Sequence, residues 1–309
     1  MDESFKNILV PIDGSFQSRI AQEMAVFISK LFKSQVTLIH VVPNELETIG
    51  KTYTLRENYA PISTATGQFP RTLSLPKTRE SVFPEELIKE VTERYRETGK
   101  ELLNESALLF NQEGISVNER LVEGNSAAEL IMAEARTGNY DLIIMGNSGG
   151  ENKLDLHLGS VAKQVSLGVK GTVLIVRRKI KVQKILIPVD GSAKDEKALQ
   201  KARIIAKATH SQIILLHVQE TSILKLKPEI REIGHQILQR ASSMLEGTQF
   251  EERLISGDPA EIIIQTAETA DVDLVVMSSG ELGTLRGFFL GSVGDHVLHH
   301  ATIPVLVVK

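Results

Sequence analysis

The sequence predicts two tandem doubly wound α/β domains, each with a five-stranded parallel sheet flanked by helices. Three observations support this fold class. A chain of 309 residues is long for one domain. A strand-and-turn sequence occurs twice, and short Val/Ile/Leu-rich runs alternate with longer helical patterns in each copy. Such alternation is typical of βα units that bury a parallel sheet.

The internal repeat sets the domain organisation. Residues 8–15 (ILVPIDGS) recur as 185–192 (ILIPVDGS), and residues 38–41 (LIHV) recur as 215–218 (LLHV), both 177 positions later. Because repeats of this kind decide the architecture, the two copies are expected to fold alike.

Later matches show where the copies differ in length. Residues 141–145 (DLIIM) recur as 273–277 (DLVVM), and 159–161 recur as 291–293, at an offset of 132. The first copy therefore carries about 45 additional residues, the difference between offsets of 177 and 132. We expect one domain over 1–178, with an insertion at about 44–95, and a second domain over 182–309.

The expected elements follow from apolar periodicity and from residues typical of helix starts. Ser15 and Ser192 directly follow the first strand of each copy and are N-cap residue types. Gly124 and Gly257 indicate turns before a later helix. In the first copy we expect strands near 6–12, 35–42, 115–122, 140–145 and 172–177, and helices near 15–33, 85–113, 126–137 and 159–169.

Composition excludes several classes of function. Lys and Arg total 35 against 39 Asp and Glu, so no net positive charge attracts nucleic acid or an anionic membrane. The chain has no cysteine, which excludes disulfides, a thiol nucleophile and cysteine metal ligands. The acidic start and the absence of a long apolar run predict a soluble, cytoplasmic protein without a signal peptide.

The spacing Gly-x2-Gly-x9-Gly-Ser, formed by Gly146, Gly149, Gly159 and Ser160, lies between an apolar run and a predicted helix. Glycine lets backbone amides approach an anion closely, and a helix start supplies unpaired N–H donors and a positive dipole end. The pattern therefore indicates a phosphate cradle, and a nucleotide is the favoured ligand. A glycine-rich loop without a ligand is the alternative.

Strand ends bring further residues to the same place. Asp13, Val41 and Gly146 fall at the predicted carboxyl ends of three strands, where doubly wound sheets bind ligands. Two of the positions have structural alternatives. The Asp-Gly-Ser sequence at Asp13 also makes a turn into a helix cap, and Pro11 is also suited to end a strand.

The chain resembles tandem members of the universal stress protein family. In the second copy, residues 282–293 (LGTLRGFFLGSV), followed by Ala301 and 304–308 (PVLVV), are similar to the carboxyl-terminal signature of that family. The resemblance implies a five-stranded sandwich of the adenine nucleotide alpha hydrolase-like type. It also implies that the glycine motif holds ATP, with Mg²⁺, as in the nucleotide-binding branch of the family.

The resemblance assigns a role to each matching residue of the first copy. Pro11 and Asp13 would border the adenosine, and the backbone of Val41 would face the adenine edge. The phosphates and ribose would lie against the remaining positions, which are Gly146, Gly149, Gly159, Ser160 and Val161.

The second copy departs from the motif. Ser278 and Glu281 stand where the first two glycines are expected, and a carboxylate close to a phosphate is unfavourable. We therefore expect a weaker second site, or none, with the retained positions Pro188, Asp190, Val218, Gly291 and Ser292.

Other features favour structural roles. Gly50-Lys51-Thr52 lacks the earlier glycine of a phosphate loop. His40 and His217 are expected to be hydrogen-bonded within the fold. His296, His299 and His300 share a helix face, where a metal site is an alternative to a favourable interaction with the helix dipole. The basic stretch over 177–184 indicates a solvated linker.

The sequence thus favours an ATP-binding regulatory or stress-response module without catalytic residues. A slow ATPase or nucleotidyl-transferring enzyme using Glu151 or Asp155 is one alternative, and a nucleotide-independent scaffold is another. The insertion is expected to act as a lid over the nucleotide. The apolar runs 173–176 and 305–308 are edge-strand candidates, which predicts an internal pseudo-dimer and leaves a homodimer open.

Overall fold

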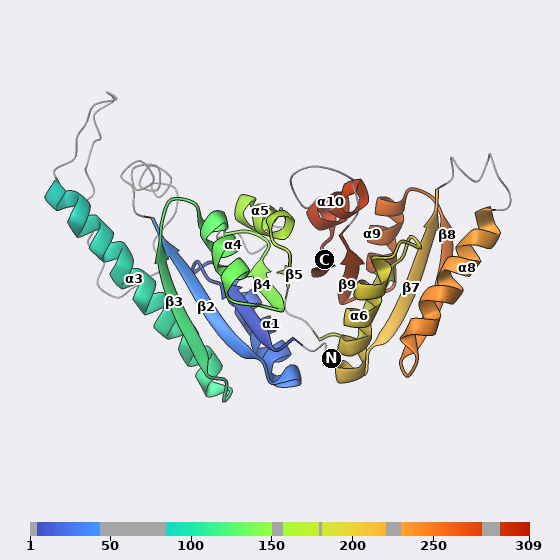
Figure 1. The fold of residues 1–309 in the computed structure, drawn as a ribbon, viewed down its shortest axis with the longest axis horizontal. Helices are drawn as coiled ribbons and strands as arrows, with labels where there is room; N and C mark the ends of the chain where they lie inside the picture. Colours follow the sequence, from blue (N-terminus) through green and yellow to red (C-terminus); the bar gives the residue numbers. More distant parts are fainter. Residues whose placement is uncertain (1–4, 44–84, 150–156, 179–180, 221–229, 280–290) are drawn as a thin grey trace, which may run out of the picture.

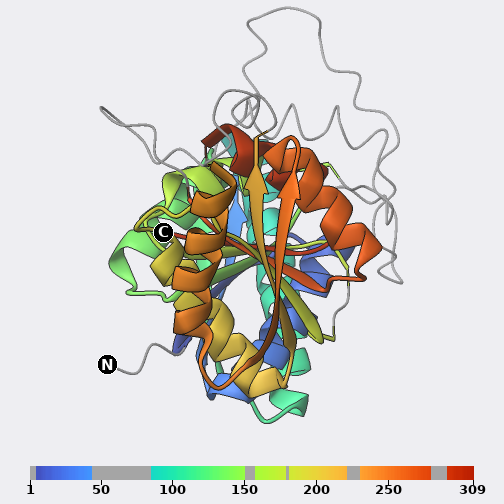
Figure 2. The ribbon, with the colours of Figure 1, turned by 90° about the vertical axis from the view of Figure 1, so that its right-hand side faces the viewer.

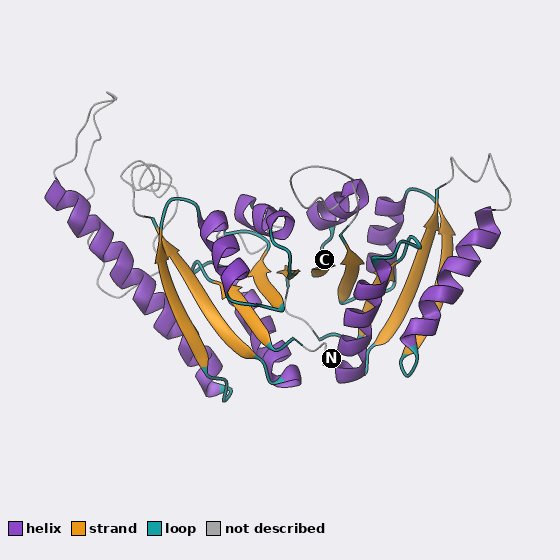
Figure 3. Cartoon of the chain, in the orientation of Figure 1, coloured by secondary structure: helices purple, strands orange, loops and turns teal. Residues whose placement is uncertain are grey.

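A computed structural model shows a single ten-stranded sheet with helices on both faces (Figures 1 and 3). It describes residues 5–43, 85–149, 157–178, 181–220, 230–279 and 291–309. The strand order is β3-β2-β1-β4-β5-β10-β9-β6-β7-β8. We call β1 to β5 with their helices the first half and β6 to β10 with theirs the second half.

The first half follows the predicted order of elements closely. Its strands are β1 (Asn7–Pro11), β2 (Gln35–Val42), β3 (Val117–Glu123), β4 (Leu142–Gly146) and β5 (Thr172–Val176). Its helices are α1 (Phe16–Phe32), α3 (Glu85–Gln112), α4 (Ala127–Thr137) and α5 (Ser160–Gly168).

The second half repeats this arrangement. Its strands are β6 (Lys184–Pro188), β7 (Gln212–Gln219), β8 (Gln249–Ser256), β9 (Leu274–Ser278) and β10 (Val305–Val308). Its helices are α6 (Asp195–Thr209), α8 (Ile230–Ser242), α9 (Pro259–Thr269) and α10 (Gly291–His300). Figure 2 shows helices on both sides of β7 and β8.

Strand pairing is parallel within each half and antiparallel where the halves meet. Strand β1 pairs in parallel with β2 and β4, and β6 pairs in parallel with β7 and β9. The two strands expected at apolar edges, β5 and β10, pair with each other, and Leu306 lies opposite Leu174. The doubly wound α/β fold with five parallel strands in each half is therefore confirmed.

The sheet is covered on both faces, which explains the continuous apolar runs of its strands. Leu142 and Ile144 of β4 pack in one core with residues of α1 and α6, whereas Ile143 and Met145 pack in the other core with residues of α5. Because successive strand residues point to opposite faces, both sets are buried only when helices lie on each side.

The two predicted N-caps have different outcomes. The Ser15 hydroxyl accepts a hydrogen bond from the Ser18 amide at 3.1 Å and caps α1, as expected. The prediction for Ser192 is wrong, because α6 begins only at Asp195 and its N-cap residue is Lys194. A turn over 191–194 takes the place of the first helical residues.

The predicted solvated linker is also wrong at its first residue. Arg177 is 3% exposed, and its guanidinium donates to the carbonyl oxygens of Leu298 and Ile303. Lys184, at the other end of the stretch, donates to the carbonyl oxygen of Ala270 at 2.9 Å. The cations lie at helix carboxyl ends because unpaired carbonyls gather there.

The predicted helix over 85–113 is confirmed as α3, which includes the last part of the expected insertion. The proposed lid over 44–84 lies outside the described residues, as do Gly50-Lys51-Thr52, Glu151, Asp155 and Glu281. Across the described part of the chain, no helix is both long and apolar enough to span a membrane.

Candidate functional site

The candidate site lies where the carboxyl ends of β1, β2 and β4 meet. From β1 the chain runs outward to β2 and β3 on one side, whereas β4 and β5 lie on the other side. The strand order therefore reverses between β1 and β4, and in doubly wound sheets ligands bind at such a point. Asp13, Val41 and Gly146 lie at or just beyond these strand ends.

Asp13 organises the turn between β1 and α1. One carboxylate oxygen, Oδ1, accepts a hydrogen bond from the Ser15 amide at 2.9 Å, and the Asp13 amide donates to the Ser18 hydroxyl at 3.3 Å. Asp13 thus has the structural role expected of an Asp-Gly-Ser turn. The residue is nevertheless exposed, and its other carboxylate oxygen, Oδ2, lies on the side of Gly149.

Gly149 lies directly against Asp13, although 136 residues separate them in sequence. A Cβ atom on Gly149 would lie 2.7 Å from Oδ2 of Asp13. Real Cβ atoms essentially never approach another atom so closely, so a larger residue would displace the carboxylate. The second glycine of the motif thus allows β1 and the loop after β4 to converge.

Gly146 has a packing role at the end of β4. A Cβ atom there would lie 2.7 Å from the carbonyl carbon of Gln17 and 2.8 Å from its oxygen, both in the first turn of α1. Backbone atoms of a helix cannot move aside easily. Glycine at this position therefore has a structural cause as well as the predicted ligand role.

The loop between β4 and α5 is held at both ends by Asn147. Its side-chain amide donates to the backbone carbonyl oxygen of His157 at 2.9 Å, and its backbone carbonyl oxygen accepts from the Gly159 amide at 2.7 Å. Asn147 is fully buried. The motif spacing gave no signal for this residue, because it occupies a position that the motif leaves unspecified.

Helix α5 begins directly after this loop. Its N-cap is Gly159, which has no side chain to cap the helix, and the first turn of α5 contains no acidic residue. Ser160 and Val161 are the first two residues of the helix. The amides of this turn are the donors that an anion would take, and the helix dipole favours negative charge at the same place.

Two buried polar side chains near the site have no hydrogen-bond partner in the described structure. They are Gln17, with both amide atoms, and Ser148, with its hydroxyl. Gln17 lies against Gly146, and Ser148 lies against Gly159. Unpaired buried polar groups are uncommon in native proteins. Because these atoms are fully enclosed, they do not by themselves indicate a ligand. The groups that fit a nucleotide are the exposed Asp13 side chain and the amides of Ser160 and Val161 at the start of α5.

The remaining predicted residues lie at the carboxyl ends of β1 and β2. Pro11 is the buried last residue of β1, but pairing continues, because the Ile12 amide donates to the Ile39 carbonyl at 2.9 Å. Val41 is half-buried and lies opposite Val122. The His40 ring is bonded to the Ile12 carbonyl at 2.8 Å, as expected for a structural histidine.

The family model that matches the chain is that of the universal stress protein family, over residues 4–61, 73–177 and 181–309. These matches cover most of the chain. The chain belongs to the universal stress protein family.

Relatives of this universal stress protein match it either in part or along its whole length. A universal stress protein of Methanocaldococcus jannaschii is 32% identical over 139 residues, covering 41% of this chain and 82% of the relative. One from Mycolicibacterium smegmatis is 24% identical over 316 residues, covering 98% of this chain and 96% of the relative. Two copies of the family fold account for both kinds of match.

A solved structure confirms the fold over the whole chain. The crystal structure of a universal stress protein from Archaeoglobus fulgidus DSM 4304 matches with a TM-score of 0.66, at 21% identity, and covers 100% of this chain and 98% of that one. At this identity the likeness establishes the architecture alone.

The second half of this universal stress protein replaces two small groups at the equivalent crevice. Ser278 occupies the position of Gly146, and Asp195 occupies that of Ser18. The Asp195 carboxylate accepts from the amides of Asp190 and Gly191 at 3.0 and 2.8 Å. The Ser278 hydroxyl reaches its other oxygen at 3.5 Å. The turn is thus closed by a carboxylate instead of a hydroxyl.

This carboxylate has an unusual acidity. Burial, together with the nearby Asp190 carboxylate, raises the pKa of Asp195 to about 6. Two carboxyl groups in one turn disfavour each other's ionised form. The second crevice therefore holds negative charge that the first lacks at this position, which is unfavourable for a phosphate ligand.

The other predicted residues of the second half lie at the expected places. Pro188 ends β6, and Val218 lies near the end of β7 opposite Ile255. Gly291 begins α10 with a φ of 74°, a left-handed conformation that favours glycine, and Ser292 follows it. The loop that would complete this site, residues 280–290, is outside the described residues.

The histidines of α10 form a structural group. His299 and His300 bond through Nδ1 to backbone carbonyls one turn earlier, at 2.7 and 2.9 Å, and the rings of His296 and His300 stack at 4.2 Å. His217 bonds to the Val189 carbonyl at 2.8 Å, which matches His40 in the first half. Within the described ranges, no group of His, Cys, Asp or Glu side chains is arranged to hold a metal ion.

Proposed function

We propose that this universal stress protein binds ATP, with Mg²⁺, in the first half, and that nucleotide occupancy regulates its conformation or association during stress. The observation that supports this most is the convergence of Gly149 on Asp13 near the first turn of α5, whose N-cap residue is a glycine. A carboxylate, glycines and the first amides of a helix at one place suit a molecule with a polar sugar and phosphates.

Each residue has a proposed role in that site. Pro11 and Asp13 border the adenosine, and the Val41 backbone faces the adenine. The phosphates lie at the start of α5, where Ser160 and Val161 offer backbone amides. Gly159, whose own amide already donates to the Asn147 carbonyl, lets the phosphates approach the backbone closely. Mg²⁺ would neutralise part of the phosphate charge when nucleotide is bound. We propose that the protein is a binding module and not an enzyme.

The proposed site in the second half, formed by Pro188, Asp190, Val218, Gly291 and Ser292, is weaker or does not bind. The buried Asp195 places negative charge beside Asp190, and Ser278 replaces the glycine that ends the equivalent strand. The added negative charge opposes a phosphate ligand. A full-length chain would then bind one nucleotide.

The proposal also covers the domains of the chain, their pairing and the location of the protein. We propose domains over 1–178 and 182–309 that pair as an internal pseudo-dimer through β5 and β10. Since both strands pair within the chain, a homodimer would need another surface. A cytoplasmic location agrees with a chain that has no cysteine.

Calorimetric titration of the nucleotide-free full-length protein with Mg-ATP tests the proposal. We expect one site per chain in the wild type and its loss in Gly149→Ala, because the new Cβ displaces the Asp13 carboxylate. The matched control is Gly171→Ala, whose Cβ would lie 3.5 Å from the nearest atom, the Tyr140 carbonyl oxygen, an ordinary contact.

Each other outcome contradicts a stated part of the proposal. Two sites would show that the second half binds nucleotide despite Asp195. Binding that survives Gly149→Ala would move the site elsewhere. No binding by the wild type would favour a nucleotide-independent scaffold.

A further inference from the structure

The contact between the halves has approximate two-fold symmetry. Leu174 of β5 lies opposite Leu306 of β10 in the antiparallel pair, and these two residues are equivalent in the repeat. In a two-fold contact, each residue close to the axis meets its own equivalent. The residues that differ between the halves near this axis therefore determine whether unlike halves or like halves fit better.

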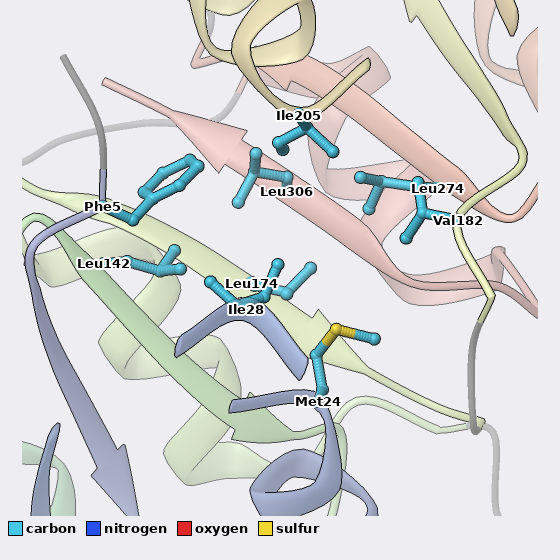
Figure 4. Close-up of a pocket in the computed structure, with 9 residues that line it drawn as sticks. All are labelled: Phe5, Met24, Ile28, Leu142, Leu174, Val182, Ile205, Leu274 and Leu306. Carbon is cyan, nitrogen blue, oxygen red and sulfur yellow. The ribbon is translucent and has the colours of Figure 1, made fainter. Parts of the chain in front are cut away.

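The apolar centre of the contact is nearly symmetric. Figure 4 shows side chains of both halves around a small buried pocket. Three equivalent pairs line it with identical residues: Ile28 with Ile205, Leu142 with Leu274, and Leu174 with Leu306. This part of the contact stabilises any pairing and does not distinguish one half from the other.

Charges at one pair of equivalent positions do distinguish the halves. Lys163 of α5 and Asp295 of α10 occupy the same place in the repeat, and Nζ lies 4.0 Å from Oδ1. In a pair made of two first halves, Lys163 would face Lys163 of the other copy. In a pair made of two second halves, Asp295 would face Asp295 of the other copy. Only the unlike pair places opposite charges together.

A second asymmetric pair lies beside the apolar pocket. Nζ of Lys201 on α6 lies 4.8 Å from the centre of the Phe5 ring. The residues equivalent to these two are Met24 and Val182. A pair of two second halves would place Lys201 near Val182. A pair of two first halves would place Met24 near Phe5. The cation–π contact therefore exists only between unlike halves.

Each half also has a cation that donates to backbone carbonyls of the other half. Arg177 reaches the carboxyl end of α10, and its equivalent, Lys309, donates to the Leu167 carbonyl of α5 at 3.1 Å. Burial lowers the pKa of Lys309 to about 8. A cation is available in either half, so these contacts strengthen the pairing without selecting a partner.

We propose that the two halves form a matched pair whose facing surfaces select the other half of the chain over a second copy of the same half. The selecting contacts are Lys163 with Asp295 and Phe5 with Lys201. The surface at β5 thus recognises a partner with a complementary charge, and two chains do not exchange like halves through it.

Nicking of the folded full-length protein tests this proposal. A protease site is inserted between Arg178 and Lys181, the purified protein is cut at low salt, and native mass spectrometry follows the pairs after equilibration. We expect one first half with one second half. Like pairs at the level of random assortment, or separation of the halves without re-pairing, would overturn the proposal.

Charge variants of the same nicked protein isolate the selecting pair. In Lys163→Asp, an aspartate faces an aspartate in the unlike pair and in both like pairs, so the ion pair no longer favours the unlike pair. The ratio of like to unlike pairs is therefore expected to rise roughly two- to five-fold, the range for an exposed ion pair. Lys163→Asp combined with Asp295→Lys restores opposite charges and is expected to restore the wild-type ratio. Lys100→Asp on α3 has the same change in net charge and is the control.

The effect of salt gives an independent criterion. The difference between Lys163→Asp and the wild type is expected to shrink as salt rises, because both side chains are about half exposed, at 45% and 46%. An unchanged ratio in Lys163→Asp, or failure of the exchanged variant to restore it, would overturn the role of this ion pair.

Discussion

At the scale of single residues, the stability of a Gly146 variant distinguishes a packing role of this glycine from a ligand-binding role. The variant Gly146→Ala places a methyl group 2.7 Å from the backbone of Gln17, so β4 and α1 must move apart. We expect the free energy of unfolding to fall by about 1–3 kcal/mol, as for other overpacked sites. Urea unfolding of the nucleotide-free protein measures this.

The control for Gly146 is again Gly171→Ala, which introduces the same methyl group where there is room. Unchanged stability in Gly146→Ala, together with lost nucleotide binding, would show that the glycine serves the ligand alone. In the second half Ser278 stands at this position, and α6 begins two positions later in the repeat than α1.

Asp195 gives a second prediction at this scale, which concerns pH. Its pKa is raised to about 6 in the folded protein, from an ordinary value of 3.8. Between these values the folded state binds the proton more tightly than the unfolded state does. This stabilisation is complete below about pH 4 and is lost as the pH rises through 6.

The variant Asp195→Asn removes this titration and can still accept from the amides of Asp190 and Gly191. Relative to Asp195→Asn, the wild type is expected to lose stability between pH 4 and 7, by at most about 3 kcal/mol. Urea unfolding of both proteins at several pH values measures the difference. Parallel pH profiles for the two proteins would show that Asp195 does not titrate in this window.

At the scale of elements, helix α10 depends on a residue from the other half of the chain. Arg177 donates to the carbonyls of Leu298 and Ile303, and burial lowers its pKa to about 10. Arg177→Ala leaves these carbonyls without that donor. We expect the free energy of unfolding to fall by about 1–3 kcal/mol.

The neighbouring Arg178 provides a matched control for that prediction. It is exposed, and its guanidinium donates a long hydrogen bond of 3.4 Å to the carbonyl of Val272. Arg178→Ala is expected to change stability by less than about 0.5 kcal/mol. Equal effects of the two substitutions, measured by thermal unfolding, would contradict a specific role for Arg177 at the end of α10.

The elements themselves were predictable because their signals are local. Strand β2 was expected over 35–42 and spans Gln35–Val42, and α3 was expected over 85–113 and spans Glu85–Gln112. Apolar periodicity and capping residues act within a few positions of the chain. The same is true of the Ser15 cap.

Contacts between distant segments were not predictable in the same way. Asn147, which ties together both ends of the glycine loop, and Arg177, which crosses into the second half, gave no periodic or motif signal. The turn before α6, where the Asp195 carboxylate accepts from two amides, is likewise a contact that no local pattern indicated. Such effects arise only when the fold brings the partners together.

At the scale of the whole molecule, the two halves share one sheet and one set of buried contacts. Backbone pairing joins β5 to β10, and Leu174 and Leu306 at its centre are almost fully buried. Arg177 and Lys309 each contact a helix of the other half. Unfolding one half would expose these apolar groups of the other, which favours cooperative unfolding of both.

This cooperativity predicts how nucleotide affects stability if the first half binds it. Mg-ATP at 100 times its dissociation constant would stabilise the protein by about 2.7 kcal/mol. Because the halves unfold together, calorimetry is expected to show one transition that moves upward as a whole, including the second half without a ligand. In Gly149→Ala the transition is expected not to move. Two transitions, of which Mg-ATP shifts only one, would mean that the shared sheet does not couple the halves, and occupancy of the first half would then have no route through β5 and β10 to the second.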